Sequence, residues 1–106
     1  MLLCKCTHWK AVAHRVPGPG EVSRRLRVTA ECECTGGHVP ELHADLITEE
    51  LVVLDLVIAQ PEQGGQEIAR KGVRFEHHIG AGPKRVRIRI PDEDDFSLPI
   101  EEMDLT

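Results

Sequence analysis

Four cysteines are the residues of this chain best suited to chemistry, and they form two Cys-x-Cys pairs. Cys4 and Cys6 lie near the N-terminus, while Cys32 and Cys34 end a stretch that alternates between apolar and polar residues from Leu26 onward. Alternate residues of a β-strand point to the same face. Each pair therefore presents both sulfurs on one side, and two such strands side by side would gather all four.

Four converging thiolates predict a metal site with Cys4, Cys6, Cys32 and Cys34 as its ligands. Zinc binds tetrahedral sets of sulfur and nitrogen, and thiolates also suit Cu(I) and iron–sulfur clusters, so zinc is the first expectation and the other two follow. His8 and His38 each lie four residues after a cysteine. Either is a candidate substitute for a distant cysteine in a Cys₃His set.

Two alternatives compete with the metal site. The spacing itself argues against zinc, because structural zinc sites more often place two residues between cysteines. In the first alternative the cysteines are reduced and act as small core residues, and there is no cofactor. The same four cysteines could also form cross-strand disulfides or a thiol redox switch built from them. A pair of sulfurs on each of two neighbouring strands is common to all these interpretations.

The elements that must position the cysteines are two strands of a hairpin. Residues 2–16 and 22–34 have strand patterns, and Pro17–Gly20 is a turn sequence that would join them. His8 continues the alternation of Cys4 and Cys6, so we expect it on the cysteine face. The pair Gly36–Gly37 ends the second strand.

Further strands complete the predicted fold, a single-domain, mainly β protein built as an antiparallel sandwich or small barrel. Residues 42–47 and 51–59 are expected to be strands joined by a turn at Thr48–Glu50, although helical spacing leaves an α+β alternative with a helix near residues 41–50. Between residues 67 and 79 the expected inward residues are Ile68, Val73, Phe75 and Ile79, and Gly72 is a candidate for a bulge. Residues 84–90 alternate cleanly.

Charge divides the chain into a β-domain of residues 1–90 and an acidic C-terminal tail of residues 91–106. All 13 Lys and Arg precede Pro91, whereas 7 of the 18 acidic residues follow it. The tail also contains Phe96, Leu98 and Ile100, which is more apolar surface than a solvating tail needs. We expect Phe96–Ile100 to be ordered against the body or a second copy, and the acids at 92–95 to stay in water.

The remaining residues favour a non-catalytic binding or assembly module over an enzyme, with a metal carrier or thiol switch as the alternative. No phosphate loop or nucleophile elbow is present, and His77–His78 would point to opposite faces of a strand. Two rows of alternating arginines are interpreted as solvated sheet faces: Arg25 with Arg27, and Arg85 with Arg87 and Arg89. We expect a protein partner or homo-oligomer, no nucleic acid or membrane, and a cytoplasmic location, because no signal peptide is visible.

Overall fold

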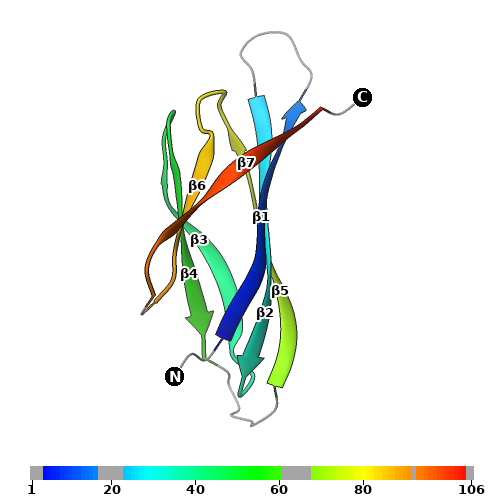
Figure 1. The fold of residues 1–106 in the computed structure, drawn as a ribbon, viewed down its shortest axis with the longest axis vertical. Coiled ribbons are helices and arrows are strands. Elements are labelled where there is room, and N and C mark those ends of the chain that lie inside the picture. The colour runs from blue at the N-terminus through cyan, green and yellow to red at the C-terminus, as the bar shows by residue number, and fades with distance from the viewer. Residues whose placement is uncertain (1–3, 17–22, 61–67, 92, 105–106) are drawn as a thin grey trace.

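Seven strands make up the fold of the computed structural model, which describes residues 4–16, 23–60, 68–91 and 93–104 (Figure 1). The expected turn at Pro17–Gly20 and residues 61–67 lie outside the described residues. Those residues contain no helix. The strands are β1 (Cys4–Val16), β2 (Ser23–Thr35), β3 (Val39–Ile47), β4 (Val52–Ala59), β5 (Ile68–Ile79), β6 (Arg85–Arg89) and β7 (Phe96–Asp104).

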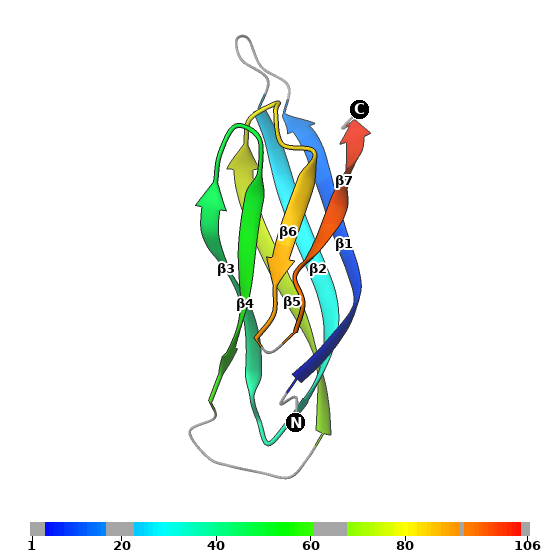
Figure 2. The same ribbon diagram turned by 60° about the vertical axis from the view of Figure 1, so that its left-hand side comes forward.

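The strands form one mixed sheet, in the order β3-β4-β6-β7-β1-β2-β5, that is nearly closed into a small barrel (Figure 2). The expected β-class is confirmed, but the sheet is not purely antiparallel, because β1 pairs with β7 and β4 pairs with β6 in parallel. The end strands β3 and β5 lie beside each other without a ladder joining their described residues. The seam between them is therefore the place where the barrel stays open.

Close contacts at both ends hold the seam together. At one end the Nζ atom of Lys71 on β5 donates hydrogen bonds to the carbonyl oxygens of His38 (3.0 Å) and Gly37 (3.5 Å) in the β2–β3 turn. At the other end Gly82 lies against the backbone of Glu49, so closely that a Cβ atom on Gly82 would come within 1.8 Å of the Glu49 carbonyl oxygen. Only glycine fits there.

The hairpin predicted from the two Cys-x-Cys strands is confirmed. β1 and β2 pair antiparallel from Cys4 opposite Cys34 to Val16 opposite Ser23, with one register shift between Thr7 and Lys10. In this β-bulge His8 and Trp9 of β1 stand against the single residue Ala30 of β2, and His8 has a φ of 59°. Before the bulge the inward-facing residues of β1 are the even-numbered Cys4 and Cys6. After the bulge they are the odd-numbered Ala11 and Ala13. His8 is therefore exposed. The expectation that it lies on the cysteine face is wrong.

Inward-facing aliphatic side chains fill the barrel. The fully buried ones include Leu26 and Val28 on β2, Val52 and Leu54 on β4, and Val86 and Ile88 on β6. The prediction of strands at residues 42–47 and 51–59 is confirmed, with Thr48–Glu50 between them. The helix alternative is wrong because Leu42 is buried whereas Leu46, which a helix would place on the same face, is 47% exposed after a bulge at Asp45.

The acidic segment contributes the strand that joins the two halves of the sheet. Phe96–Pro99 pairs antiparallel with β6, and Ile100–Asp104 pairs in parallel with β1, so that β7 crosses from one half to the other in Figure 1. Phe96–Ile100 is thus ordered against the body as expected. Among the preceding acids, the described residues 93–95 are exposed.

A buried arginine closes the end of the barrel away from the cysteines. Arg24 is 3% exposed and continues the inward row of β2 beyond Leu26. Its guanidinium donates hydrogen bonds to the carbonyl oxygens of Gly80 (2.9 Å) and Pro83 and to the carboxylate of Glu102. Arg24 therefore fixes β7 and the β5–β6 turn on β2 with three charge-assisted hydrogen bonds.

Two details of the β5 prediction are wrong. Gly72 pairs with Glu31 in an unbroken β2–β5 register, so it marks no bulge. Ile68, at the start of β5, is 71% exposed, while Val73 and Ile79 are buried and Phe75 is partly buried. The described part of the chain contains no helix long and apolar enough to cross a membrane.

Candidate functional site

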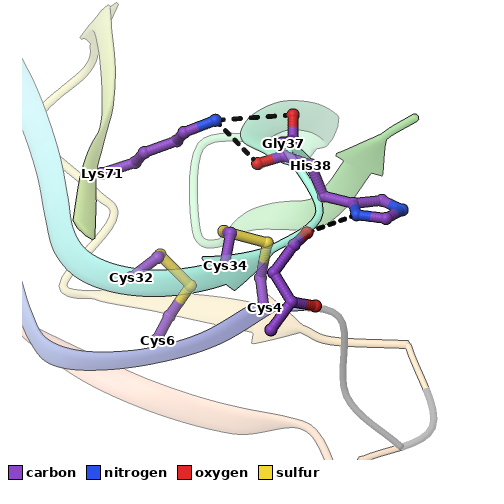
Figure 3. The surroundings of a disulfide bond; sticks show 8 residues. Cys4, Cys6, Cys32, Cys34, Gly37, His38 and Lys71 are labelled. Carbon is purple, nitrogen blue, oxygen red and sulfur yellow. Dashed lines mark hydrogen bonds between the residues drawn. A yellow bond between two sulfur atoms is a disulfide. The ribbon is translucent and has the colours of Figure 1, made fainter. Parts of the chain in front are cut away.

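The four cysteines form two disulfides between β1 and β2, Cys4–Cys34 and Cys6–Cys32 (Figure 3). The antiparallel register places the members of each pair directly opposite, with Cα–Cα distances of 4.0 Å and 3.9 Å. The prediction that one sheet face gathers sulfurs from both Cys-x-Cys pairs is confirmed. Of the three interpretations, the structure shows the cross-strand disulfides.

The predicted metal set is not assembled in this oxidised state. A disulfide sulfur has given up the thiolate charge that makes cysteine a metal ligand. His8 lies on the outer face, where its Nδ1 atom is 3.0 Å from the Thr7 hydroxyl and 3.3 Å from a Glu31 carboxylate oxygen. His38 contacts the carbonyl oxygen of Thr35 in its own turn, with Nδ1 at 2.6 Å.

No other set of ligands replaces the predicted one within the part of the chain that the structure describes. It contains no group of three or more histidine, cysteine or acidic side chains placed to hold a metal ion. His77 and His78 are adjacent on β5 and both exposed, and the ring of His77 stacks on Phe75 with centroids 6.1 Å apart. These histidines thus do not converge on one ligand position.

The two disulfides differ in exposure. Cys4, Cys32 and Cys34 are buried, with exposed fractions of 2%, 1% and 0%, whereas Cys6 is only partly buried. Both members of the Cys4–Cys34 pair are therefore shielded from solvent. In the Cys6–Cys32 pair, Cys6 is partly exposed to solvent. Since access to sulfur controls thiol–disulfide exchange, the two bonds are chemically unequal.

The segment of β1 that carries both cysteines, Cys4–Thr7, has a strand on one side only; we call it the N-terminal arm. It pairs with residues 31–34 of β2, while the pairing of β1 with β7 begins at Ala11. None of the described residues forms a ladder on its other side. The arm is consequently an edge strand beside β2 and β5, and its outer edge is unpaired among the described residues.

A bulge and an aromatic contact separate the arm from the rest of β1. His8 adopts the left-handed backbone region, which costs a non-glycine residue about 1–2 kcal/mol. The next residue, Trp9, packs edge-to-face on Phe96 of β7, with ring centroids 5.5 Å apart. Beyond Trp9, β1 is held by β2 and β7 together. The sequence does carry a signal for this bulge, namely the change from even to odd inward positions between Cys6 and Ala11.

The strand opposite the arm is enclosed on both sides. β2 pairs with β1 and with β5 along the whole cysteine stretch, so that Cys32 lies opposite both Cys6 and Lys71. Figure 3 shows Lys71 extending from β5 over this end of the hairpin toward the Gly37 and His38 carbonyl groups. The cysteines of β2 thus have a second paired strand beyond them, whereas among the described residues those of β1 have none.

The outer face of the same sheet region is hollowed above Gly72. A Cβ atom there would meet nothing within 4 Å, and the hollow, of about 520 Å³, is bordered by Lys5, Arg70 and Glu33. Cations and acids alternate around it, so it has no strong preference for ions of one sign. It lies on the face of the sheet opposite the buried cysteine side chains.

Acidic partners neutralise much of the predicted basic face. Glu76 accepts hydrogen bonds from Arg25 (2.9 Å) and Arg27 (2.8 Å), which hold the pKa of its carboxyl below the ordinary value. Asp55 is paired with Arg89 through two hydrogen bonds of 2.5 Å and 2.8 Å, and these lower the pKa of Asp55 in the same way. These pairings favour a solvated sheet face over a phosphate-binding stripe.

No protein-family model, curated protein or solved structure matches the chain at a significant level. Inferences about function therefore rest on the geometry of this chain: the N-terminal arm, the bulge at His8, and two disulfides of unequal exposure.

Proposed function

We propose that the protein is a redox-controlled, non-catalytic assembly module in which the two disulfides latch the N-terminal arm onto the edge of β2. The observation that carries this proposal is the one-sided pairing of Cys4–Thr7, which no second strand supports among the described residues. In the oxidised protein the latch is closed. Reduction of both bonds releases the arm about the bulge at His8.

The energetics indicate that the disulfides are needed to hold the arm on β2, because the backbone ladder alone holds it weakly. Without cross-links the arm is an edge strand of only four residues, and a single ladder, the one to β2, holds it to the sheet. Ordering each backbone residue costs roughly 1–2 kcal/mol, whereas a net hydrogen bond returns only about 0.5–1.5 kcal/mol. The barrel beyond Trp9 keeps its own ladders and core. Reduction should therefore free the arm and leave the barrel folded.

Release of the arm would uncover the edge of β2 at residues 31–34. An unpaired strand edge recruits another strand through its free backbone groups. The occupant that fits best is the same arm of a second copy, because its sequence already matches this edge in register and side-chain pattern. Exchange of an arm about a hinge is a common route to dimers. This is the homo-oligomer that the sequence led us to expect.

The redox state of the cysteines also bears on location. Stable disulfides are typical of oxidising compartments, while cytosolic ones are usually transient and regulatory. A latch that opens and closes is compatible with the expected cytoplasmic location, and a permanently closed one favours an oxidising compartment.

The metal-carrier alternative applies to the reduced protein. Its four thiols would still lie on one sheet face in two neighbouring register rows, which is the observation that favours this second candidate. Zinc or Cu(I) would then bind only after reduction. Retention of one equivalent of zinc by reduced protein, and none by oxidised protein, after desalting would support it. Equal retention by both would contradict it.

Limited trypsin digestion tests the latch, because Lys5 lies in the arm while Lys10 and Arg15 lie in the part of β1 beyond the bulge. We expect cleavage after Lys5 in reduced protein and protection of all three sites in oxidised protein. Protection of Lys5 after full reduction would contradict the proposal. So would simultaneous cleavage at all three sites, which would show that the disulfides hold the whole fold together.

The oligomeric state tests the exchange. Protein that is reduced, concentrated and reoxidised should yield dimers that separate only under reducing conditions, with Cys4 of one copy linked to Cys34 of the other. A variant with all four cysteines replaced by alanine is the control for covalent capture. Reoxidation to monomers alone, at any concentration, would refute arm exchange.

A further inference from the structure

We infer that the two disulfides open in a fixed order and that the Cys6 sulfur is the site of attack by an external thiol, which forms a mixed disulfide there. This inference rests on the proposed latch and names the modification site that operates it. The molecule that attacks the Cys6 sulfur is a thiol or dithiol reductant. Cys4–Cys34 is then the second bond to open.

The direction of attack selects Cys6. A thiolate displaces its leaving group by approaching along the extension of the sulfur–sulfur bond, so the space behind the attacked sulfur must be open. Each disulfide here joins neighbouring strands. Behind Cys32 lies β5, with Lys71 directly opposite, whereas behind Cys6 is the free edge of the arm. Attack from the arm side is therefore the accessible route.

Burial separates the two bonds on that side. Cys4 shares the free edge of the arm with Cys6, but it is 2% exposed, and its partner Cys34 is fully buried. Cys6 is the one cysteine of the four that is partly exposed. The Cys6–Cys32 bond is consequently the entrance for a reductant, and Cys4–Cys34 becomes accessible once the first bond has opened.

The exchange at Cys6 takes place in two displacement steps. The external thiolate forms a bond to the Cys6 sulfur, the Cys6–Cys32 bond breaks, and Cys32 departs as a thiolate that takes up a proton from water. A second thiol of the reductant then attacks the mixed disulfide and releases Cys6 as a thiol. The protein gains two electrons and two protons, and the external dithiol becomes a disulfide.

Peptide mapping of native protein treated briefly with reduced glutathione tests this inference. After an acid quench and capping of free thiols with N-ethylmaleimide, we expect glutathione on Cys6 and the maleimide on Cys32, with Cys4–Cys34 still intact. Protein unfolded in urea is the matched control, and there the glutathione should spread over all four cysteines. Glutathione on Cys4, Cys32 or Cys34 of native protein, or an even spread, would overturn the inference.

Two double variants extend the test to rates. With Cys4 and Cys34 replaced by alanine, the remaining bond should be reduced by dithiothreitol at least about tenfold faster than the bond left when Cys6 and Cys32 are replaced. Equal rates, or the opposite order, would overturn the inference. The proposed function fails separately: if fully reduced protein remains protected from trypsin at Lys5, the latch is wrong whichever sulfur is attacked.

Discussion

Removing one disulfide should cost much less than half of what removing both costs, because the two bonds close nested loops. Cys6 and Cys32 are 26 residues apart in sequence, and Cys4 and Cys34 are 30 apart. Once either bond exists, the other closes only a small ring through the neighbouring residues of β1 and β2. The stabilisation of each bond thus depends on the presence of the other.

Loop-closure entropy gives the magnitudes. A single cross-link of either span stabilises the folded state by about 3.5 kcal/mol relative to an unfolded chain without cross-links. With the first bond in place, the second closes a ring of about six residues and adds only about 2 kcal/mol. Loss of either pair alone should therefore cost about 2 kcal/mol, and loss of both about 5.5 kcal/mol.

Urea unfolding of three alanine variants measures this cycle: Cys4 with Cys34, Cys6 with Cys32, and all four cysteines. The same variants measured in reductant serve as the control, since there the cross-links are absent and the remaining differences come from side-chain packing alone. A coupling of about 1.5 kcal/mol between the two pairs is expected. Additive losses, with each pair costing about 3.5 kcal/mol, would refute the nested arrangement of the bonds.

Three further outcomes follow from contacts elsewhere in the barrel. Gly82→Ala should lower the urea midpoint because its Cβ atom would collide with the β3–β4 turn, whereas Gly80→Ala, which meets nothing within 4 Å, should leave the midpoint unchanged; equal effects would contradict the close approach. Arg24→Met should cost about 3 kcal/mol in the same assay, since it leaves two carbonyl groups and a carboxylate without their donor, and a loss below 1 kcal/mol would contradict that role. Because Arg89 lowers the pKa of Asp55 in the folded state, this carboxylate stabilises the protein above its ordinary pKa of 3.8, and the contribution disappears as pH falls below that value; Asp55→Asn should therefore flatten the acid limb of stability against pH, and an unchanged limb would contradict it.

Alternation predicted which faces the cysteine strands bury, but it could not reveal their oxidation state. The period of two places Cys4 with Cys6 and Cys32 with Cys34 on one face whether the sulfurs hold a metal, pack as thiols or form disulfides. The register decides, because it sets Cys4 opposite Cys34 at a Cα distance of 4.0 Å. Register depends on the bulge at His8, which we read as a continuation of the strand.

Neighbour relations between distant strands were equally hidden. The apolar residues Phe96, Leu98 and Ile100 predicted that the acidic segment packs on the body, and it does. Nothing in their pattern indicates that β7 changes partners near Pro99, from β6 to β1, or that its second half pairs in parallel. Hydrophobic period reports which face of a strand is buried, whereas pairing depends on contacts between segments far apart in the chain.

Amide hydrogen exchange of the oxidised and fully reduced protein, followed residue by residue, tests the central claim most directly. Oxidised protein should protect both the arm and the second half of β1. After reduction, the amides of Lys5 to Thr7 that pair with β2 should lose at least about a hundredfold in protection, while those of Ala11 to Arg15, which lie between β2 and β7, should keep theirs. Unchanged protection of the arm, or its loss together with that of Ala11 to Arg15, would contradict a disulfide latch on the N-terminal arm.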